Sequence, residues 1–473
     1  MEFPSPVRLP VIADSNPSAP MTWGQIAIWD VLAWLSPDEA SLNMPAVLPT
    51  PRGTTVDLVL KVIRQLVLRH ESLRTAYMSI DGELRQCVKN EINLDIFTLE
   101  APSDEEVNGL AESAAIELRR DTFDISSGVP LRVALVVRDG FVRSIALVAS
   151  HMAIDTGSFL IVYNECKALL ASNGDPDSLP RRSQQPVERA EFEASPAGAE
   201  RQARTLAFWR KTTSLASPAS ISRLSIPTDD QLAWASIESE ALALATNDLA
   251  ARYSVGPSAV ILASLGLLIA GYTDQPGPVF RSLTATRFRP HDREFVGAFN
   301  LNSMIHVATD SQLFADHVRQ TAGTTLRAFL RCEANPRLVE DAVNEAASAR
   351  GITPGSYCFF NDTASGRMSE SDSDEVAAQG AIAAAARDTR IVALPYQGRQ
   401  LDSKFFVFLN SLHPTCVMRL CKDRRFIPNV SPSEFFTALE NLIVEAASTP
   451  GISVKELLDR LPDDARAGSD RRS

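Results

Sequence analysis

A histidine and an aspartate four residues apart are the clearest candidates for chemistry in this chain. His151 follows an apolar run, residues 144–149, with Ser150 between them, and Asp155 is followed by Thr156 and Gly157. The apolar run predicts a buried strand, and a strand that ends at His151 would deliver the imidazole into a cleft. Histidine side chains titrate near neutral pH, so an imidazole placed in this way is a reasonable general base.

A predicted hairpin and a predicted helix set these residues in place. Residues 131–137 and 142–149 are apolar runs joined by an Asp-Gly turn, which favours a hairpin whose second strand leads to His151. A helix is expected over residues 156–170. Gly157 would then lie at a helix start, where backbone N–H groups point outward and bind anions.

The rest of the chain alternates helical and extended patterns. The predicted helices are residues 23–34, 56–73, 103–120, 258–270, 314–333 and 435–447, and the predicted strands include residues 74–80, 83–88, 278–285, 302–308, 356–361, 390–394, 404–412 and 415–421. Ser103, with Glu106 three residues later, is the expected N-cap of its helix in a capping box. The two halves repeat the same order of elements, which favours an α/β fold of two layered subdomains with mixed sheets and a cleft between them.

A polar, proline-rich stretch divides the chain. Residues 171–199 are rich in Pro, Asn, Asp and Gln, a composition typical of a linker. We expect an N-terminal subdomain with the histidine motif over residues 1–180, a linker over 181–205, a C-terminal subdomain over 206–462 and a frayed tail over 463–473. The acidic and alanine-rich run at residues 369–387 is expected to be a mobile loop or a lone helix.

Length and charge exclude several classes of protein. A chain of 473 residues is too long for one core, and 45% hydrophobic with 22% charged residues is a globular composition. The net charge of −12 argues against a general nucleic-acid binder, which needs a basic face. No apolar run approaches the roughly 18 residues of a membrane span, and the N-terminus lacks a signal-peptide pattern. We therefore expect a cytoplasmic protein that binds neither nucleic acid nor membrane.

The cysteines do not indicate a metal site. Six cysteines are scattered along the chain, without a Cys-x-x-Cys pair and without clustered histidines. This pattern favours free, inert thiols over a disulfide framework or a structural zinc site. No metal and no bound cofactor is expected.

Several short strings, taken in chain order, resemble the motifs of nonribosomal peptide synthetase condensation domains. The strings are residues 21–29, 69–75, 123–132, 150–157, 208–210, 284–290 and 297–299. The resemblance covers nearly the whole chain. It implies a V-shaped pseudodimer of two chloramphenicol-acetyltransferase-like subdomains, with the active site at their interface and tunnels entering from both sides.

The resemblance also implies roles for individual residues. His151 matches the catalytic histidine of the family, and Asp155 matches a mainly structural aspartate that pairs with an arginine of the other subdomain. Arg287 lies at the matching arginine position. A bidentate, charge-assisted contact between the two side chains would fix the histidine loop.

Two residues depart from the family pattern. Ser150 replaces the first histidine of the motif, which supports the loop and is not the base. Thr156 replaces the motif glycine, where the family keeps its backbone close to the thioester carbonyl. A β-branched residue there would narrow the donor channel or shift an amide that helps to hold the oxyanion. Gly157 is expected to compensate for this change from the next position.

The function implied is that of a free-standing condensation enzyme. It would transfer an acyl or aminoacyl group from the phosphopantetheine thioester of an acyl or peptidyl carrier protein, in trans, to an amine or hydroxyl acceptor. The acceptor would be a small molecule or a group on a second carrier protein, and the product an amide or an ester in natural-product biosynthesis. His151 would take the proton or position the nucleophile, and backbone amides near Thr156 and Gly157 would hold the oxyanion.

Two alternatives remain open. The chain is a catalytically degenerate module that recruits carrier proteins or tailoring enzymes, or it is an acyltransferase that takes its donor from acyl-coenzyme A. Ser150 and Thr156 motivate the first alternative. A monomer is expected in each case.

Overall fold

The computed structural model describes residues 2–181, 184–364, 379–398, 400 and 402–462. The chain forms two compact units, one of Met1–Gln202 with Ala285–Leu301 and one of Ala203–Thr284 with Asn302–Ser473. The division near residue 202 lies close to the predicted one. The inclusion of Ala285–Leu301 in the first unit was not predicted, because the sequence pattern assigned this segment to the C-terminal subdomain. The expected frayed tail lies outside the described residues, as does much of the acidic run.

The first unit contains a five-stranded sheet in the order β1-β6-β7-β8-β3 and a three-stranded sheet in the order β2-β5-β4. Its main elements are β1 (Val7–Ile12), β2 (Ser18–Pro20), α1 (Trp23–Leu35), β3 (Met44–Pro49), α2 (Val56–Arg69), β4 (Thr75–Ile80), β5 (Glu83–Val88), β6 (Glu91–Glu100), α3 (Val107–Arg119), β7 (Leu131–Arg138), β8 (Phe141–Ala149), α4 (Thr156–Ala171) and α5 (Pro186–Ala194). The predicted β7-β8 hairpin and the helix after it are both present.

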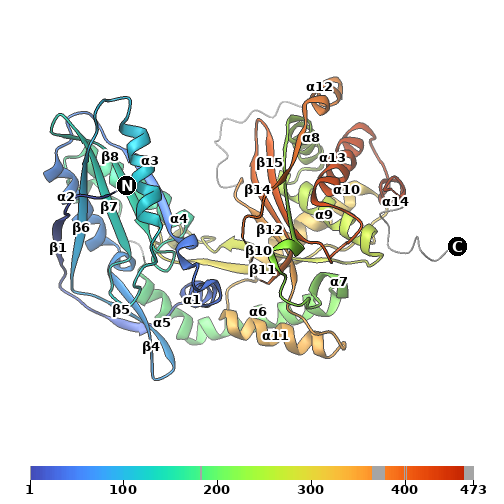
Figure 1. The fold of residues 1–473 in the computed structure, drawn as a ribbon. Helices are drawn as coiled ribbons and strands as arrows, with labels where there is room; N and C mark the ends of the chain where they lie inside the picture. The colour runs from blue at the N-terminus through green and yellow to red at the C-terminus, as the bar shows by residue number, and fades with distance from the viewer. Residues whose placement is uncertain (1, 182–183, 365–378, 399, 401, 463–473) are drawn as a thin grey trace. The chain divides into compact units, whose positions relative to one another are not determined.

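Both faces of the five-stranded sheet are covered by helices (Figure 1). Successive side chains of a strand point to opposite faces, and β7 shows the consequence. Val133 and Leu135 pack with α2 and α4, whereas Ala134 packs with the alanine-rich side of α3. Because β7 and β8 are buried on both faces, they are apolar along almost their whole length.

The second unit contains a seven-stranded mixed sheet in the order β11-β10-β12-β14-β15-β9-β13. Its main elements are α7 (Pro218–Ile221), β9 (Leu232–Ser239), α8 (Glu240–Tyr253), α9 (Pro257–Thr273), β10 (Val279–Ala285), β11 (Asn300–His306), α10 (Phe314–Phe329), α11 (Pro336–Ser348), β12 (Tyr357–Asp362), α12 (Gln379–Ala385), β13 (Arg390–Leu394), β14 (Ser403–Leu412), β15 (Cys416–Asp423), α13 (Pro432–Ser448) and α14 (Val454–Asp459). The long helix α6 (Pro196–Leu215) contains the division between the units.

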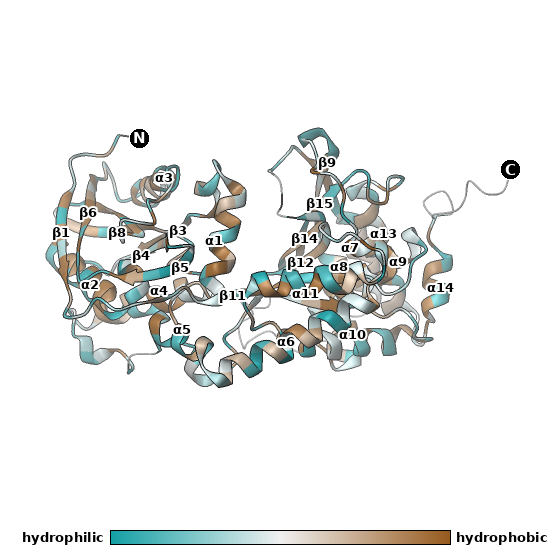
Figure 2. Ribbon diagram, turned by 90° about the horizontal axis from the view of Figure 1, so that it is seen from below, coloured by the Kyte–Doolittle hydropathy of each residue, from teal (hydrophilic) through white to brown (hydrophobic). Residues whose placement is uncertain are grey.

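The sheet of the second unit is also covered on both faces. Phe405 and Val407 of β14 pack in the cluster that contains α8, α9, α10 and α13, and Phe406 packs in the cluster that contains α6 and α11. Figure 2 shows hydrophilic and hydrophobic stretches along α6 and α11, as expected of helices with one buried side. No single helix of the described residues is long and apolar enough to cross a membrane, although α8 and α9 meet that test as a pair bent by 104°.

Two sequence predictions about helices are wrong. The predicted linker, residues 181–205, contains α5 and the first half of α6, and Pro186 and Pro196 are the first residues of these helices. Proline is favoured at a helix start as well as in linkers, so composition alone misled the prediction. Helix α3 starts at Val107 without a capping box, and the Ser103 hydroxyl contacts the Glu106 carboxylate instead of a backbone N–H.

A buried lysine of the second unit gives stability a pH dependence. The Lys404 ammonium group donates hydrogen bonds to the carbonyl oxygens of Ala219 at 2.7 Å and Ser222 at 2.8 Å. Burial lowers the pKa of Lys404 from 10.5 to about 8. Between these two values the unfolded chain binds more protons than the folded chain, so folding becomes more favourable as pH rises.

We therefore predict that the free energy of unfolding of the wild type gains up to about 3 kcal/mol relative to the Lys404→Met variant between pH 8 and pH 10.5. Urea denaturation of both proteins at pH 7.5 and pH 10 measures this gain. Other groups titrate equally in the two proteins and cancel from the difference. An unchanged difference between the two pH values would contradict the burial of a charged amine at this position.

Candidate active site

His151 lies in the turn that follows β8, and its side chain is half-buried. Its Nδ1 atom is 2.9 Å from the carbonyl oxygen of Ile154. Because a carbonyl oxygen only accepts hydrogen bonds, Nδ1 carries the proton and donates it to Ile154. The lone pair of the neutral imidazole therefore lies on Nε2, and this is the tautomer that a general base needs.

Asp155 is the N-cap of α4 and is completely buried. Its Oδ1 atom accepts a hydrogen bond of 2.7 Å from the backbone N–H of Ser158. Aspartate is among the best N-cap residues because its side chain satisfies an N–H group that has no partner inside the helix. The local sequence therefore fixes both the start of α4 and the length of the turn that holds His151.

Asp155 also forms a bidentate pair with Arg287, as the family resemblance implied. The distances are 2.8 Å from Nη1 to Oδ2 and 2.7 Å from Nη2 to Oδ1. Phe299 donates its backbone N–H to Oδ2 at 3.2 Å. With the N–H of Ser158, the carboxylate thus accepts four hydrogen bonds.

The prediction that this pair joins two subdomains is wrong for the units found here. Arg287 belongs to the segment Ala285–Leu301, which is part of the same unit as Asp155. Thr286 donates its hydroxyl to the carbonyl oxygen of Phe299 at 2.5 Å, and this bond joins the two ends of the segment. The pair therefore attaches a returning loop to α4 within the first unit.

Gly157 makes room for the Arg287 guanidinium. A Cβ atom on Gly157 would lie 2.7 Å from Nη1 and 2.9 Å from Cζ of Arg287, well inside van der Waals contact. The space beside Gly157 is therefore filled by Arg287. This is a different use of the glycine from the predicted one, in which Gly157 compensates for the loss of glycine at position 156 near the thioester.

We predict that Gly157→Ala destabilises the protein by about 1–3 kcal/mol, the usual cost of overpacking. The guanidinium is the end of a flexible side chain, but its hydrogen bonds to Asp155 prevent an easy movement. Thermal unfolding measures the effect. Gly109→Ala in α3 is the matched control, because nothing lies within 4 Å of the added Cβ atom and alanine favours a helix. Equal stability of the two variants would contradict the packing of Arg287 on Gly157.

Ser150 and Thr156 occupy the two ends of the histidine turn. Ser150 is buried, and its backbone carbonyl accepts a hydrogen bond of 3.0 Å from the N–H of Ala153, which closes the turn. Thr156 is exposed at the first position of α4. Within the described part of the chain, the N–H groups of Thr156 and Gly157 have no protein acceptor. Such groups at a helix N-terminus bind anionic oxygen atoms.

Ser158 was missed by the sequence analysis. Its hydroxyl is completely buried and contacts both Arg287 and Gly297. A serine in the first turn of an apolar helix is a weak signal of a buried polar contact. Its partners lie 129 and 139 residues further along the chain, so the sequence pattern does not reveal them.

The motif at residues 69–75 anchors the other half of α4. Arg69 Nε and His70 Nε2 lie 2.9 Å and 2.6 Å from the two carboxylate oxygens of Glu165, which is a residue of α4. Burial raises the pKa of the Glu165 carboxyl, but the hydrogen bonds and charges of His70 and Arg69 outweigh it and leave this pKa below its ordinary value. The motif thus fixes α4 against the end of α2.

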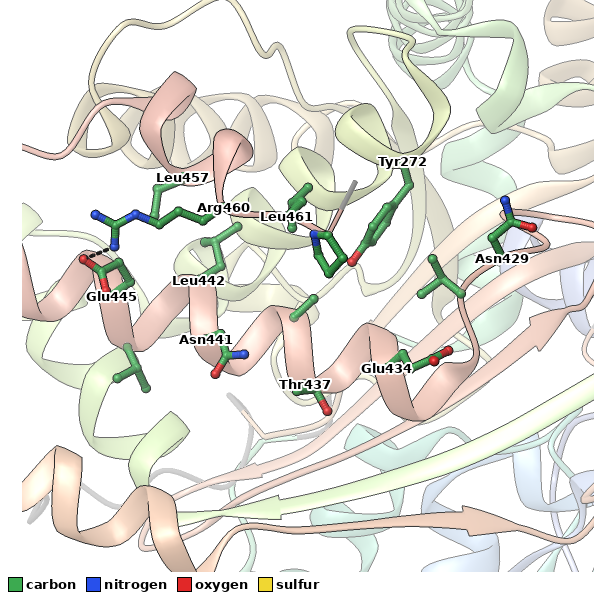
Figure 3. Close-up of a pocket in the computed structure, with 14 residues that line it drawn as sticks. Tyr272, Asn429, Glu434, Thr437, Asn441, Leu442, Glu445, Leu457, Arg460 and Leu461 are labelled. Carbon is green, nitrogen blue, oxygen red and sulfur yellow. Dashed lines mark ion pairs between the residues drawn. The ribbon is translucent and has the colours of Figure 1, made fainter. Parts of the chain in front are cut away.

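A cavity of about 520 Å³ lies in the second unit (Figure 3). It is lined by residues of α9, α13 and α14, with Tyr272 and Glu434 towards one end and the ion pair of Arg460 and Glu445 at the other. Burial first, and the Glu434 charge second, raise the pKa of Tyr272 to about 12. No residue of the histidine site lines this cavity.

Comparisons with known proteins agree with this arrangement. The chain is 26% identical over 359 residues to phosphinothricin tripeptide synthetase PhsC of Streptomyces viridochromogenes, an alignment that covers 73% of this chain and 32% of PhsC. The chain thus spans about a third of the length of that relative. Among solved structures, the condensation domain of the monacolin K polyketide synthase MokA is similar with a TM-score of 0.66 and 13% identity, covering 93% of this chain and 99% of that one.

A second solved structure, SgcC5 of Streptomyces globisporus, is similar with a TM-score of 0.63 and 17% identity, covering 92% of this chain and all of that one. These similarities confirm the predicted α/β fold class. The model of the Condensation domain family matches residues 18–345, which is more than half of the chain and includes every residue of the histidine site. The resemblance inferred from the motifs is confirmed, and this chain belongs to the Condensation domain family.

Proposed function

We propose that this protein transfers an acyl or aminoacyl group from the phosphopantetheine thioester of a carrier protein to an amine or hydroxyl acceptor. Condensation, in which acyl transfer forms an amide or an ester, is the general chemistry of the family. The observation that carries the proposal is the hydrogen bond of 2.9 Å between His151 Nδ1 and the Ile154 carbonyl, which leaves Nε2 able to accept a proton.

The reaction proceeds in two balanced steps. The acceptor nitrogen or oxygen forms a bond with the thioester carbonyl carbon while Nε2 of His151 accepts the proton that the acceptor loses. The carbonyl oxygen becomes an oxyanion, and the N–H groups of Thr156 and Gly157 are the donors we assign to it. The carbon–sulfur bond then breaks, and the phosphopantetheine sulfur leaves with the proton from the imidazolium. His151 returns to its neutral form.

Ser150 is compatible with catalysis at this site. The turn after β8 is closed by backbone bonds of Ser150 to Pro130 and Ala153, of 2.9 Å and 3.0 Å, and neither bond needs a histidine side chain. A histidine at position 150 is therefore not required to hold His151. This supports the catalytic function over a degenerate recruitment module.

The proposal is tested by incubating the protein with carrier proteins that carry different acyl groups, together with an amine or a hydroxyl acceptor. Intact mass spectrometry follows the loss of the acyl group from the carrier, and the product is identified separately. Transfer from the carrier but not from the matching free coenzyme A thioester supports the proposal. Equal transfer from coenzyme A assigns the donor to that alternative, and tight carrier binding without transfer from any donor assigns the protein to recruitment.

A further inference from the structure

The Ser158 hydroxyl uses all of its hydrogen-bonding capacity at one point of the first unit. It accepts hydrogen bonds from Nη2 of Arg287 at 2.7 Å and from the N–H of Gly297 at 3.0 Å. It donates its proton to the carbonyl oxygen of Gly297 at 2.9 Å. A hydroxyl has one proton to donate and two lone pairs that accept. A side chain without a hydroxyl at this position would therefore lose at least one of these three hydrogen bonds.

Ser158 acts together with Asp155 on the same loop. The two residues are three positions apart and lie on one face of the α4 start, where Asp155 holds Arg287 and Phe299 while Ser158 holds Arg287 and Gly297. Arg287 Nη2 also donates to the carbonyl oxygen of Phe295 at 3.0 Å. The loop Ala285–Leu301 is thus attached to the first turn of α4 through the Arg287 guanidinium and through the backbone of Gly297 and Phe299.

The position of Arg287 bears directly on the groups assigned to the oxyanion. Its Nη1 atom lies 2.7 Å from where a Cβ atom on Gly157 would be, so a movement of the guanidinium changes the packing of the Gly157 backbone. The N–H groups of Thr156 and Gly157 are part of that same turn. Oxyanion donors act in catalysis only when they are held in place before the charge develops.

We propose that Ser158 is a positioning residue for acyl transfer, which holds Arg287 against Gly157 and thereby fixes the first turn of α4. This inference rests on the proposed function, because it concerns the reaction at that site. Ser158 touches none of the reacting atoms and acts through Arg287. Loss of the Ser158 hydroxyl should therefore reduce the stabilisation of the transition state more than it reduces the affinity for the carrier-bound donor.

The test measures kcat and KM for a carrier-bound donor with the Ser158→Ala variant. We expect kcat to fall by about 10- to 100-fold, with KM within twofold of the wild type, since displacement of an oxyanion donor costs rate and not binding. Ser144→Ala is the matched control, because Ser144 is completely buried in β8 of the same unit and its hydroxyl bonds only the Leu48 carbonyl among the described contacts. Its kcat should stay within twofold of the wild type.

A double-mutant cycle then asks whether Ser158 acts through Arg287. In an Arg287→Lys background, which keeps the charge but not the guanidinium fork, Ser158→Ala should change kcat by less than twofold. An unchanged kcat of Ser158→Ala in the wild-type background, or an undiminished effect in the Arg287→Lys background, overturns the positioning role while the proposed function stands. Absence of transfer by the wild type with every donor overturns both.

Discussion

Replacing His151 by alanine is expected to lower kcat for acyl transfer by about 10²- to 10⁴-fold, which is the usual contribution of a general base. The melting temperature should stay close to that of the wild type. His151 is half-buried, and among the described contacts its imidazole makes one hydrogen bond, to Ile154, and no ion pair. Steady-state kinetics with a carrier-bound donor and calorimetry of the same samples measure the two quantities.

The His70→Ala variant provides the opposite control. His70 is buried and lies 2.6 Å from Glu165, so its loss should lower the melting temperature by removing a partner of a buried carboxylate. Because His70→Ala lowers stability but leaves the general base in place, this variant should keep most of its kcat when the assay temperature is well below its melting temperature. A kcat of His151→Ala within threefold of the wild type would remove His151 from the reaction.

The largest effect on stability is expected for Arg287→Ala. Asp155 is completely buried and its carboxylate takes half of its hydrogen bonds from Arg287. The variant leaves this charge without compensation, which costs about 3–5 kcal/mol. For a unit of this size the melting temperature should fall by roughly 6–20 °C. Activity should fall as well, because the loop and the start of α4 lose their shared attachment.

The Asp155→Ala/Arg287→Ala double variant isolates the interaction energy between the two side chains from their other contacts. Removal of both charges leaves no unpaired ion, so the double variant should be less destabilised than the sum of the two single variants. Calorimetry of the four proteins gives this coupling. Full stability of Arg287→Ala, or strict additivity in the cycle, would show that the pair does not hold the loop.

The local part of the site could be predicted from sequence. A strand that leads to His151 and a helix after Asp155 depend on neighbouring residues, and the structure contains both, with β8 ending at Ala149 and α4 starting at Thr156. The partner of Asp155 lies 132 residues away and came only from the family resemblance. Ser158 and the packing of Gly157 could not be predicted, because both depend on where the loop with Arg287 returns to α4.

Prolines account for several of the errors in the fold. The strands β1 and β3 were not predicted, and they contain Pro10 and Pro45. Both are edge strands of the five-stranded sheet, where a residue without an N–H group is tolerated. In the same way, Pro186 starts a helix where the sequence suggested a linker. A proline can end a helix, begin a helix or lie in an edge strand. Its place in the tertiary structure decides between these, and amino-acid composition carries no information about that place.

The most direct test of the account is a single-turnover measurement with the wild type and a carrier protein loaded with an acyl thioester. Intact mass spectrometry follows the loss of the acyl group in the presence and absence of a nucleophilic acceptor. The account predicts acceptor-dependent loss, matched by an equal amount of amide or ester, and a rate of this loss that falls by about 10²- to 10⁴-fold with His151→Ala. Acceptor-independent loss at the rate of spontaneous hydrolysis, with every donor tried, would contradict it.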